Sequence, residues 1–290
     1  VTVANSFQPE KRLHGFDNNA DQAYVFEVNA LDYLDAAEEL VLLSNPISTK
    51  ANVAIFGKRA FRRPLTTEEL TSYEAMFDSD GGAVVVQAML NSPNFLYRSE
   101  LGANAGNGTY VLSQYEIATA LSYLFLQTTP SDTLLAAADA NQLSTAAQIR
   151  SQAQSLLNQT TDAQRAVGDF ALQWLGVQGL GDESRVNTGF DNVRDDMLQE
   201  TRDFVNHVIF NSTGTYEELL TAQYTVASSE LASYYGYAGS GIVNYSGAQG
   251  RSGLFGHGSF LSTFSVFDEP HPIKRAAAVR QNFLCDPLPL

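Results

Sequence analysis

The densest group of titratable and hydrogen-bonding side chains in the C-terminal half of this 290-residue sequence lies near its end. His257 and Ser259 lie at the end of a Gly-rich segment, residues 236–258, with Arg251 before them and His271 after them. Imidazole, hydroxyl and guanidinium groups that converge can transfer protons and hold an anionic group, as a hydrolase or a metal site requires. The candidate catalytic residues are His257, Ser259 and His271, and the candidate substrate-binding residues are Arg251 and Arg275.

The same side chains allow a structural interpretation. Neighbouring His and Ser residues form a nucleophile–base pair only where the fold brings them into the right geometry. His257 could instead cap the helix that follows it, beside flexible glycines, and this is the interpretation that we favour. A catalytic site requires the candidates to line one concave surface that solvent can reach. Burial of His257 against the next helix would favour the structural role.

Four of the 17 basic residues fall within six positions, at Lys58, Arg59, Arg62 and Arg63. On a helix these four side chains share one face. They could form an anion site, in which a guanidinium fork holds a carboxylated sugar or a cofactor propionate. They could also pair with acidic neighbours and fix one helix against the next domain. We favour the second interpretation, because arginine pairs inside folds are common.

Residues 17–21, Asp-Asn-Asn-Ala-Asp, place oxygen ligands at alternate positions, as a calcium-binding loop does. The pattern then fails, because Gln22 stands where the loop requires Gly and Val28 stands where it requires Glu. A turn stabilised by Asp and Asn side chains is the favoured explanation. Whether the chain holds a metal stays open.

Several cofactor motifs are absent from the sequence. The single Cys excludes covalent haem attachment through a Cys-x-x-Cys-His motif, and we expect no cofactor in this chain. There is no phosphate-binding loop, no Gly-x-Gly-x-x-Gly after a strand and no Gly-x-Ser-x-Gly nucleophile elbow. Of the other histidines, His14 has no companion at ligand spacing, and His207 is expected to pair with Asp203 one helical turn earlier.

Helices are expected to position most of these residues. Five segments open with a capping-box pattern, in which a Ser or Thr and a Glu or Gln three residues later bond the free amides of a first turn. The pairs are Thr66/Glu69, Ser113/Glu116, Thr145/Gln148, Thr161/Gln164 and Thr215/Glu218. Helices are predicted over residues 31–43, 51–61, 67–77, 83–97, 114–127, 131–140, 146–157, 163–175, 192–210 and 273–284.

The clearest helix, over residues 192–210, carries one apolar stripe at the 3.6-residue period. Its members are Met197, Leu198, Thr201, Phe204, Val205, Val208 and Ile209. The helix over residues 114–127 is expected to point Leu121 and Leu124 inward and to be buried on all sides at its tail. Strand signals are few, at residues 108–112, 224–227 and 242–245. The fold is therefore predicted to be mainly α, a multi-helix globular fold with a few short strands and a Gly-rich loop region before the C-terminal helices.

A flexible connector by composition, Gly102–Gly108, suggests a domain boundary. It would separate an N-terminal helical domain, residues 1–102, from a larger helical domain, residues 109–290, that holds the Gly-rich loop region. Residues 286–290 are predicted to begin a Pro-rich linker.

The composition excludes one class of partner and favours one compartment. With 32 acidic and 17 basic residues the net charge is −15, which argues against a nucleic acid ligand. No apolar run approaches the ~20 residues that a membrane-spanning helix requires. Only 17% of the residues are charged, and a polar, acidic surface of this kind suits a secreted or periplasmic protein.

The ends of the sequence suggest a processed chain. It begins at Val1, its first Met is Met76, and it ends in a Pro-rich stretch beside its one Cys, Cys285. An odd Cys in an exported protein suggests a missing partner. We expect a piece of a longer exported precursor, in which Cys285 bonds to a Cys outside these residues, in a further C-terminal domain.

Six phrases of the sequence together point to a family. They are residues 15–21 (GFDNNAD), 56–66 (FGKRAFRRPLT), 88–101 (AMLNSPNFLYRSEL), 112–116 (LSQYE) with 121–123 (LSY), 170–175 (FALQWL) and 251–261 (RSGLFGHGSFL). In this order the chain resembles exported multidomain proteins of unknown function from planctomycetes, myxobacteria and marine gammaproteobacteria. Those proteins are often fused or genetically linked to c-type cytochrome domains, so the resemblance implies a bacterial chain with a possible cytochrome partner.

These observations leave three function classes. The leading expectation is an accessory or binding module of an exported protein that acts on extracellular polymers or redox partners, with a glycan or a cytochrome as the partner. The second is a glycan-active hydrolase or lyase with its site around His257. The third is a structural or assembly protein, which should show a large apolar surface patch.

Overall fold

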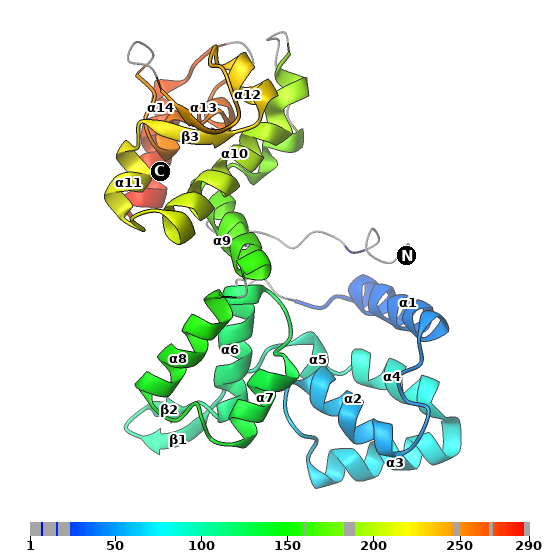
Figure 1. Ribbon diagram of the computed structural model, residues 1–290. Coiled ribbons are helices and arrows are strands. Elements are labelled where there is room, and N and C mark those ends of the chain that lie inside the picture. Colours follow the sequence, from blue (N-terminus) through cyan, green and yellow to red (C-terminus); the bar gives the residue numbers. More distant parts are fainter. Residues whose placement is uncertain are drawn as a thin grey trace. The chain divides into compact units, whose positions relative to one another are not determined.

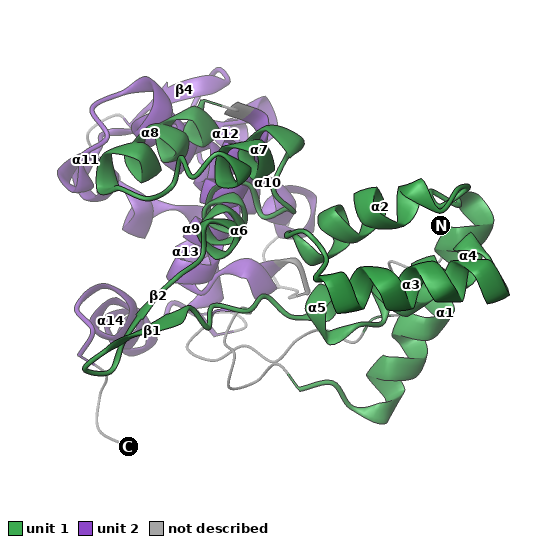
Figure 2. Ribbon diagram, turned by 90° about the horizontal axis from the view of Figure 1, so that it is seen from below, with its two compact units in different colours: residues 1–12, 17–160 green, residues 13–16, 161–290 purple. Residues whose placement is uncertain are grey.

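The computed structural model describes residues 7, 16, 24–158, 160–182, 189–245, 250–266 and 269–286. The prediction of a mainly α fold is confirmed, since 65% of the described residues are helical and these residues form only a few short strands in two small sheets (Figure 1). The contacts divide the chain into two compact units, unit 1 (residues 1–12 and 17–160) and unit 2 (residues 13–16 and 161–290), as Figure 2 shows. None of the helices in these described ranges is both long and apolar enough to cross a membrane.

The predicted connector is an ordered hairpin. Residues 102–108 lie inside unit 1, where β1 (Ala103–Gly106) and β2 (Thr109–Val111) pair as antiparallel strands. Asn107 and Gly108, at the turn, both have a positive φ. An Asn-Gly pair is the preferred two-residue hairpin turn, because its twist matches that of the strands. The Gly-rich composition therefore reflects a tight turn, and the contacts divide the chain into its two units between residues 160 and 161.

Unit 1 begins with helices packed around one apolar core. The first five are α1 (Glu27–Leu43), α2 (Ala51–Phe61), α3 (Thr67–Asp80), α4 (Gly82–Leu90) and α5 (Pro93–Leu96). Helix α4 lies against α1, α2 and α3. The buried side chains of this core are Ile47, Val53, Ala60, Phe61, Val85, Val86 and Met89.

The β1–β2 hairpin leads into three further helices, α6 (Gln114–Leu126), α7 (Asp132–Asp139) and α8 (Ala146–Leu157). Helix α6 packs against both α7 and α8. Its buried residues are Ala118, Thr119, Leu121, Ser122 and Leu126, whereas Leu124 is 69% exposed. The expectation of a tail buried on all sides is therefore wrong. Small residues at 118 and 122 set the packed face, and Leu124 lies outside it.

Unit 2 is built around one long helix. Its elements are α9 (Thr160–Leu175), η3 (Gln178–Asp182), α10 (Phe190–Asn211), α11 (Tyr216–Thr221), β3 (Tyr224–Ala227), α12 (Ser229–Tyr234), β4 (Gly241–Asn244), η4 (Leu254–Gly256), α13 (Gly258–Thr263) and α14 (Pro272–Phe283). Strands β3 and β4 pair antiparallel, and β3 lies along α10. The predicted stripe of α10 is largely confirmed, because Met197, Thr201, Phe204, Val205 and Val208 are buried.

The capping patterns locate several helix starts correctly. Full capping boxes form at Thr66, Ser113 and Thr145. Thr215 accepts the backbone N–H of Glu218, as predicted. Helix α9 begins at Thr160, so Thr161 lies within its first turn rather than before it.

Gly82 is the position in unit 1 that we predict to tolerate a side chain least. A Cβ atom added there would lie 1.7 Å from the backbone oxygen of Ile47, inside the core. Because backbone must move to relieve this contact, Gly82→Ala should lower the free energy of unfolding by about 3 kcal/mol. Gly179→Ala is the control, since an added Cβ meets nothing within 4 Å there. Urea unfolding followed by circular dichroism compares the two, and equal stability would contradict the close approach.

Candidate functional site

Two of the sequence candidates lie in a buried polar network of unit 2. His257 and Ser259 have no exposed surface. Both side chains contact the hydroxyl of Thr201 on α10, whose Oγ1 atom lies 3.1 Å from His257 Nδ1 and 2.7 Å from Ser259 Oγ. The structure therefore links His257 and Ser259 through a third side chain.

The centre of this network is Glu200, a carboxylate that is only 1% exposed. Its Oε1 atom accepts a hydrogen bond from Thr225 Oγ1 at 2.8 Å, and its Oε2 atom accepts one from the hydroxyl of Tyr235 at 2.7 Å. No cation among the described residues forms an ion pair with it. Two neutral donors therefore replace the water that a buried carboxylate loses.

Gly258 completes the attachment of the network to the backbone. Its N–H donates to the Tyr235 hydroxyl oxygen at 3.0 Å. A Cβ atom at this position would lie 2.2 Å from that oxygen and 2.8 Å from Met197 Sδ. The glycine after His257 is thus explained by close approach, because any side chain would displace Tyr235.

The donor count orders the protons along the network. Thr225 donates its one hydroxyl proton to Glu200, so it can only accept from His257 Nε2, which lies 3.5 Å from Thr225 Oγ1. With Nε2 protonated, Nδ1 of the neutral ring accepts from the Thr201 hydroxyl, which shares its one proton with the backbone oxygen of Met197 at 3.3 Å. Ser259 then donates to Thr201 Oγ1. The result is one chain of hydrogen bonds, from Ser259 through Thr201, His257 and Thr225 to Glu200.

Burial keeps the ring neutral. It lowers the pKa of His257 from the usual 6.5, because the imidazolium would lose its hydration. The Glu200 carboxylate opposes this shift of the pKa, and the Arg251 guanidinium adds to it. Burial also raises the pKa of the Tyr235 hydroxyl well above its ordinary value. Both groups therefore serve as neutral hydrogen-bonding partners at pH 7.

Arg251, the first of the candidate binding residues, is held in place on both sides. It donates through Nη1 to the backbone oxygen of Gly256 at 2.8 Å. Its guanidinium carbon lies 3.9 Å from the centre of the Tyr235 ring, which is a cation–π contact. Arg251 thus fixes the turn before His257 and packs on the tyrosine that supports Glu200.

The last two candidates belong to α14. His271 accepts the backbone N–H of Lys274 through Nδ1 at 3.2 Å and caps this helix. Arg275 donates to the backbone oxygen of Leu261 at 2.8 Å. In the described part of the chain, no contact joins either side chain to the network around Glu200.

The expectation that the candidates line one surface that solvent reaches is wrong for His257 and Ser259, which the core encloses. The physical reason is that both ring nitrogens of His257 have hydroxyl partners. Its ring also packs edge-on against that of Phe204, with 4.8 Å between the ring centres. The favoured structural interpretation also needs correction. His257 occupies the N-cap position of α13, but its side chain does not cap that helix.

Sequence reasoning missed Glu200 and Thr225, although one signal was present. Glu200 lies three residues after Met197 and four before Phe204, inside the apolar stripe of α10. A carboxylate at such a position requires buried donors. Thr225 and Tyr235 carry no comparable signal, because either residue type is common on a strand or helix that packs on a core.

The clustered cations of unit 1 have acidic or backbone partners. Lys58 pairs with Asp139 and Arg59 pairs with Asp132, which links α2 to α7. The interpretation that these cations pair with acidic neighbours is confirmed for both.

Arg62 anchors the chain that follows α4. It is 4% exposed, and its φ of +59° is a left-handed conformation that ends α2. Its Nη2 atom donates to the backbone oxygens of Asn94, Phe95 and Tyr97 at 2.8–3.1 Å. Burial lowers the pKa of this guanidinium. Three carbonyl dipoles therefore replace an acidic partner.

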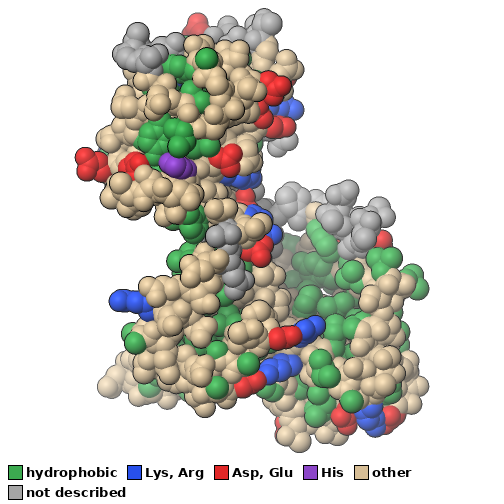
Figure 3. Space-filling model, viewed as in Figure 1, with side chains coloured by type: hydrophobic (Ala, Val, Ile, Leu, Met, Phe, Trp, Pro, Cys, Tyr) green, Lys and Arg blue, Asp and Glu red, His purple; other side chains and the backbone are tan. Residues whose placement is uncertain are grey.

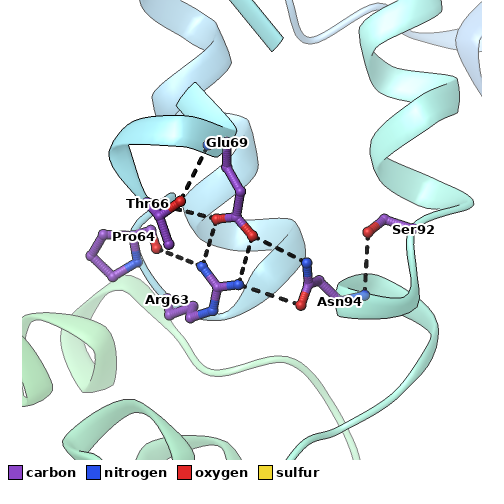
Figure 4. Close-up of polar contacts among 6 residues, drawn as sticks. All are labelled: Arg63, Pro64, Thr66, Glu69, Ser92 and Asn94. Atoms are coloured by element: carbon purple, nitrogen blue, oxygen red, sulfur yellow. Dashed lines mark hydrogen bonds and ion pairs between the residues drawn. The ribbon is translucent and has the colours of Figure 1, made fainter. Parts of the chain in front are cut away.

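Arg63 forms a forked ion pair with Glu69, with both N–O distances at 2.8 Å (Figure 4). Glu69 also accepts the backbone N–H of Thr66 and so completes the capping box of α3. Asn94 bonds both partners, accepting from Arg63 and donating to Glu69. The bond from Arg63 lowers the pKa of the Glu69 carboxyl most, and the bond from the backbone N–H of Thr66 lowers it further.

A cavity of about 360 Å³ adjoins this ion pair within unit 1. Glu116 on its wall accepts the backbone N–H groups of Leu101, Gly102 and Ser113. Burial raises the pKa of the Tyr115 hydroxyl to about 12, so it stays protonated and donates to Asp139. The lining residues are Phe61, Arg62, Arg63, Asn94, Ser99, Leu101, Gly102, Ala103, Val111, Ser113, Tyr115, Glu116 and Thr119.

The remaining metal and histidine predictions have mixed outcomes. His14 and residues 17–21 lie outside the described residues. Within the described ranges, no group of three His, Cys, Asp or Glu residues is placed to hold a metal ion. The expected His207–Asp203 pair is absent there, because His207 packs edge-on against the ring of Tyr224.

Cys285 is an exposed free thiol, and its bond to another domain stays a prediction.

Three family models match the chain. PSD3, a protein of unknown function (DUF1587), matches residues 1–43, and PSD5, a protein of unknown function (DUF1595), matches residues 48–100. PSD4, a protein of unknown function (DUF1592), matches residues 112–237. No curated protein and no solved structure matches. The chain is thus similar to three families of unknown function, and the interval between the second and third matches contains the predicted connector at 102–108.

We predict that Thr225 contributes strongly to the stability of unit 2. Thr225→Val keeps the shape of the side chain but removes the donor to Glu200 and the acceptor for His257. A buried carboxylate oxygen then lacks a partner, so the free energy of unfolding should fall by about 2 kcal/mol. Thr221→Val, on the exposed face of α11, is the matched control and should change it by less than about 0.5 kcal/mol. Urea unfolding followed by circular dichroism measures both, and equal effects would refute the network.

The stability of the chain should depend on pH through His257. The folded pKa lies below the unfolded value of 6.5, so the unfolded chain binds more protons between these two values. The free energy of unfolding should therefore fall as the pH drops below about 6.5. The contribution of His257 to this fall should end once the pH is below the folded pKa of the ring. His257→Gln removes this contribution, so its unfolding free energy should change less over the same range. Parallel curves for the two proteins would contradict the prediction.

Proposed function

We propose that this chain is an accessory, non-catalytic binding module of an exported protein that acts on extracellular polymers. The observation that carries the proposal is the cavity of unit 1, whose lining combines hydrogen-bonding side chains with two aromatic rings. Its volume, about 360 Å³, lies within the range of ordinary small-ligand sites.

The charges around this cavity are already balanced. Arg63 is paired with Glu69, Arg62 is held by three carbonyls, and Glu116 accepts three backbone N–H groups. The cavity therefore offers a ligand oriented dipoles and aromatic surface rather than a net charge. Hydroxyl groups of a neutral sugar suit such a lining. A polyanionic polymer is disfavoured, because the whole chain carries a net charge of −15.

The lining is also held in place before a ligand binds. Glu116 ties the hairpin to the first turn of α6, and Arg62 and Arg63 tie the end of α2 to the residues of α5. Preorganisation of this kind supports binding, because little conformational entropy is lost when the ligand arrives.

A hydrolase is the second candidate function. The observation that favours it is the chain of bonds from Ser259 to His257 and on to Glu200, which contains the residue types of nucleophilic catalysis. Since His257 and Ser259 have no exposed surface, this activity would require the segment over residues 251–259 to move.

We predict that filling the cavity weakens sugar binding. Ala103 lines the cavity and Ala105, on the same strand, does not. Ala103→Phe should weaken the binding of neutral β-glucan or xylan oligosaccharides at least about tenfold, because the ring occupies the space of the ligand. Ala105→Phe makes the same substitution two residues on and should leave the affinity unchanged. Isothermal titration calorimetry with a panel of neutral and uronate-containing oligosaccharides measures both.

Three results would overturn this proposal. One is the absence of binding to every oligosaccharide of the panel, and another is equal weakening by the two substitutions. The third is the release of new reducing ends during incubation with the chain, which would favour the hydrolase and is tested further with His257→Ala.

A further inference from the structure

One face of α1 in unit 1 carries large apolar side chains that no part of the described structure covers. Leu42 is 87% exposed, and Leu31 and Val28 are each 56% exposed. The opposite side of the helix packs, since Ala36 and Ala37 are buried. In Figure 3, hydrophobic side chains lie at the surface over this part of unit 1. An isolated exposed leucine needs no explanation, but a row of them marks an interaction surface.

The spacing of these residues forms a regular seam. Positions 28, 31, 35, 38 and 42 follow one another at alternate steps of three and four residues, which places them along one line of the helix. We call these five residues the α1 seam: Val28, Leu31, Asp35, Glu38 and Leu42. All five are exposed. This is the spacing at which one helix packs along another, with knobs from each helix filling holes in its partner.

The α1 seam is apolar at its ends and acidic in its middle. Asp35 and Glu38 have no cationic partner among the described residues. The whole helix carries five acidic residues and neither Lys nor Arg. A partner helix that packed only apolar side chains along this seam would bury two carboxylates without compensation, which is costly.

This charge pattern also excludes two other occupants. A second copy of α1, packed antiparallel, would place the acidic middle of one seam against that of the other, and like charges would repel. The surface of an anionic bilayer would repel the same carboxylates. The complementary occupant is a helix with apolar residues opposite Val28, Leu31 and Leu42 and with Lys or Arg opposite Asp35 and Glu38.

We propose that the α1 seam is a docking surface for a helix of a partner protein that is apolar at its ends and basic in its middle. The helix binds along α1, buries the three apolar side chains and forms two charge-assisted contacts at the centre of the interface. This docking is independent of the cavity and of any ligand bound there.

A pair of designed helical peptides tests this proposal with the full 290-residue chain. Both peptides carry Leu at the outer seam positions, and they differ only at the two central positions, which are Lys in one and Glu in the other. Fluorescence anisotropy of the labelled peptides should show at least about tenfold tighter binding of the Lys peptide. That preference should shrink as salt is added, because salt screens the central contacts.

Variants of the chain identify the surface. Leu42→Ser should weaken binding of the Lys peptide at least about tenfold, whereas Leu124→Ser, at an exposed leucine of α6, should leave it unchanged. Asp35→Asn combined with Glu38→Gln should remove the preference for Lys over Glu. Circular dichroism establishes that each variant is folded.

Several outcomes would overturn the proposal. They are failure of the Lys peptide to bind, equal binding of both peptides, and equal effects of Leu42→Ser and Leu124→Ser. Sedimentation provides one more, because a dimer of the chain that dissociates in Leu42→Ser would make a second copy the occupant.

Discussion

The buried carboxylate of Glu200 is the constraint on which unit 2 depends. A charge at this depth is tolerated only if its oxygens keep hydrogen-bond donors, and these come from Thr225 on β3 and Tyr235 at the end of α12. Tyr235 in turn requires Gly258, because its hydroxyl lies where a Cβ would be. One side chain of α10 thus fixes the positions of a strand, a helix end and the turn into α13. These directional hydrogen bonds add a specific register to the packing of the elements.

In unit 1, charged side chains also fix the positions of neighbouring segments, but their partners are backbone groups. Arg62 donates to three backbone carbonyls at α5 and the residue after it, and Glu116 accepts from three backbone N–H groups on either side of the hairpin. One is a cation held by acceptors and the other an anion held by donors, so neither needs an opposite charge. In each unit, an arginine that the sequence offers as a binding residue bonds backbone oxygens: Arg62 bonds those of α5, and Arg251 bonds that of Gly256 in the turn before α13.

The sequence predicts most of the long helices and several of their starts, because periodicity and caps are local. It joins α4 and α5 into one helix over residues 83–97, and it misses the short helices α12 and α13. It places the buried face of α10 correctly but not that of α6, where Leu124 is exposed and small residues make the contact. It identifies His257 and Ser259 as candidate site residues but does not reveal that they are buried. Their burial depends on Thr225 and Glu200, which come from elements far away in the sequence. The composition of residues 102–108 does not reveal the hairpin, because Asn-Gly in a tight turn and Gly in a linker look alike.

Glu200, Arg62 and Glu116 already have hydrogen-bond partners within the chain. We therefore place the proposed recognition of ligands and partners at two other surfaces, the cavity of unit 1 and the α1 seam. The ligand proposed for the cavity of unit 1 would meet rigid dipoles, so its shape and the geometry of its hydroxyl groups would determine its affinity more than its charge. The protein proposed to dock at the α1 seam would meet apolar side chains around two acidic ones, so charge would determine which partner fits and apolar burial would supply the affinity. The two proposed surfaces lie on different elements. The first would select its ligand by shape and hydrogen bonding, and the second would select its partner by charge. The proposed accessory module would hold a polymer and a protein partner at once, because the two proposed surfaces do not overlap.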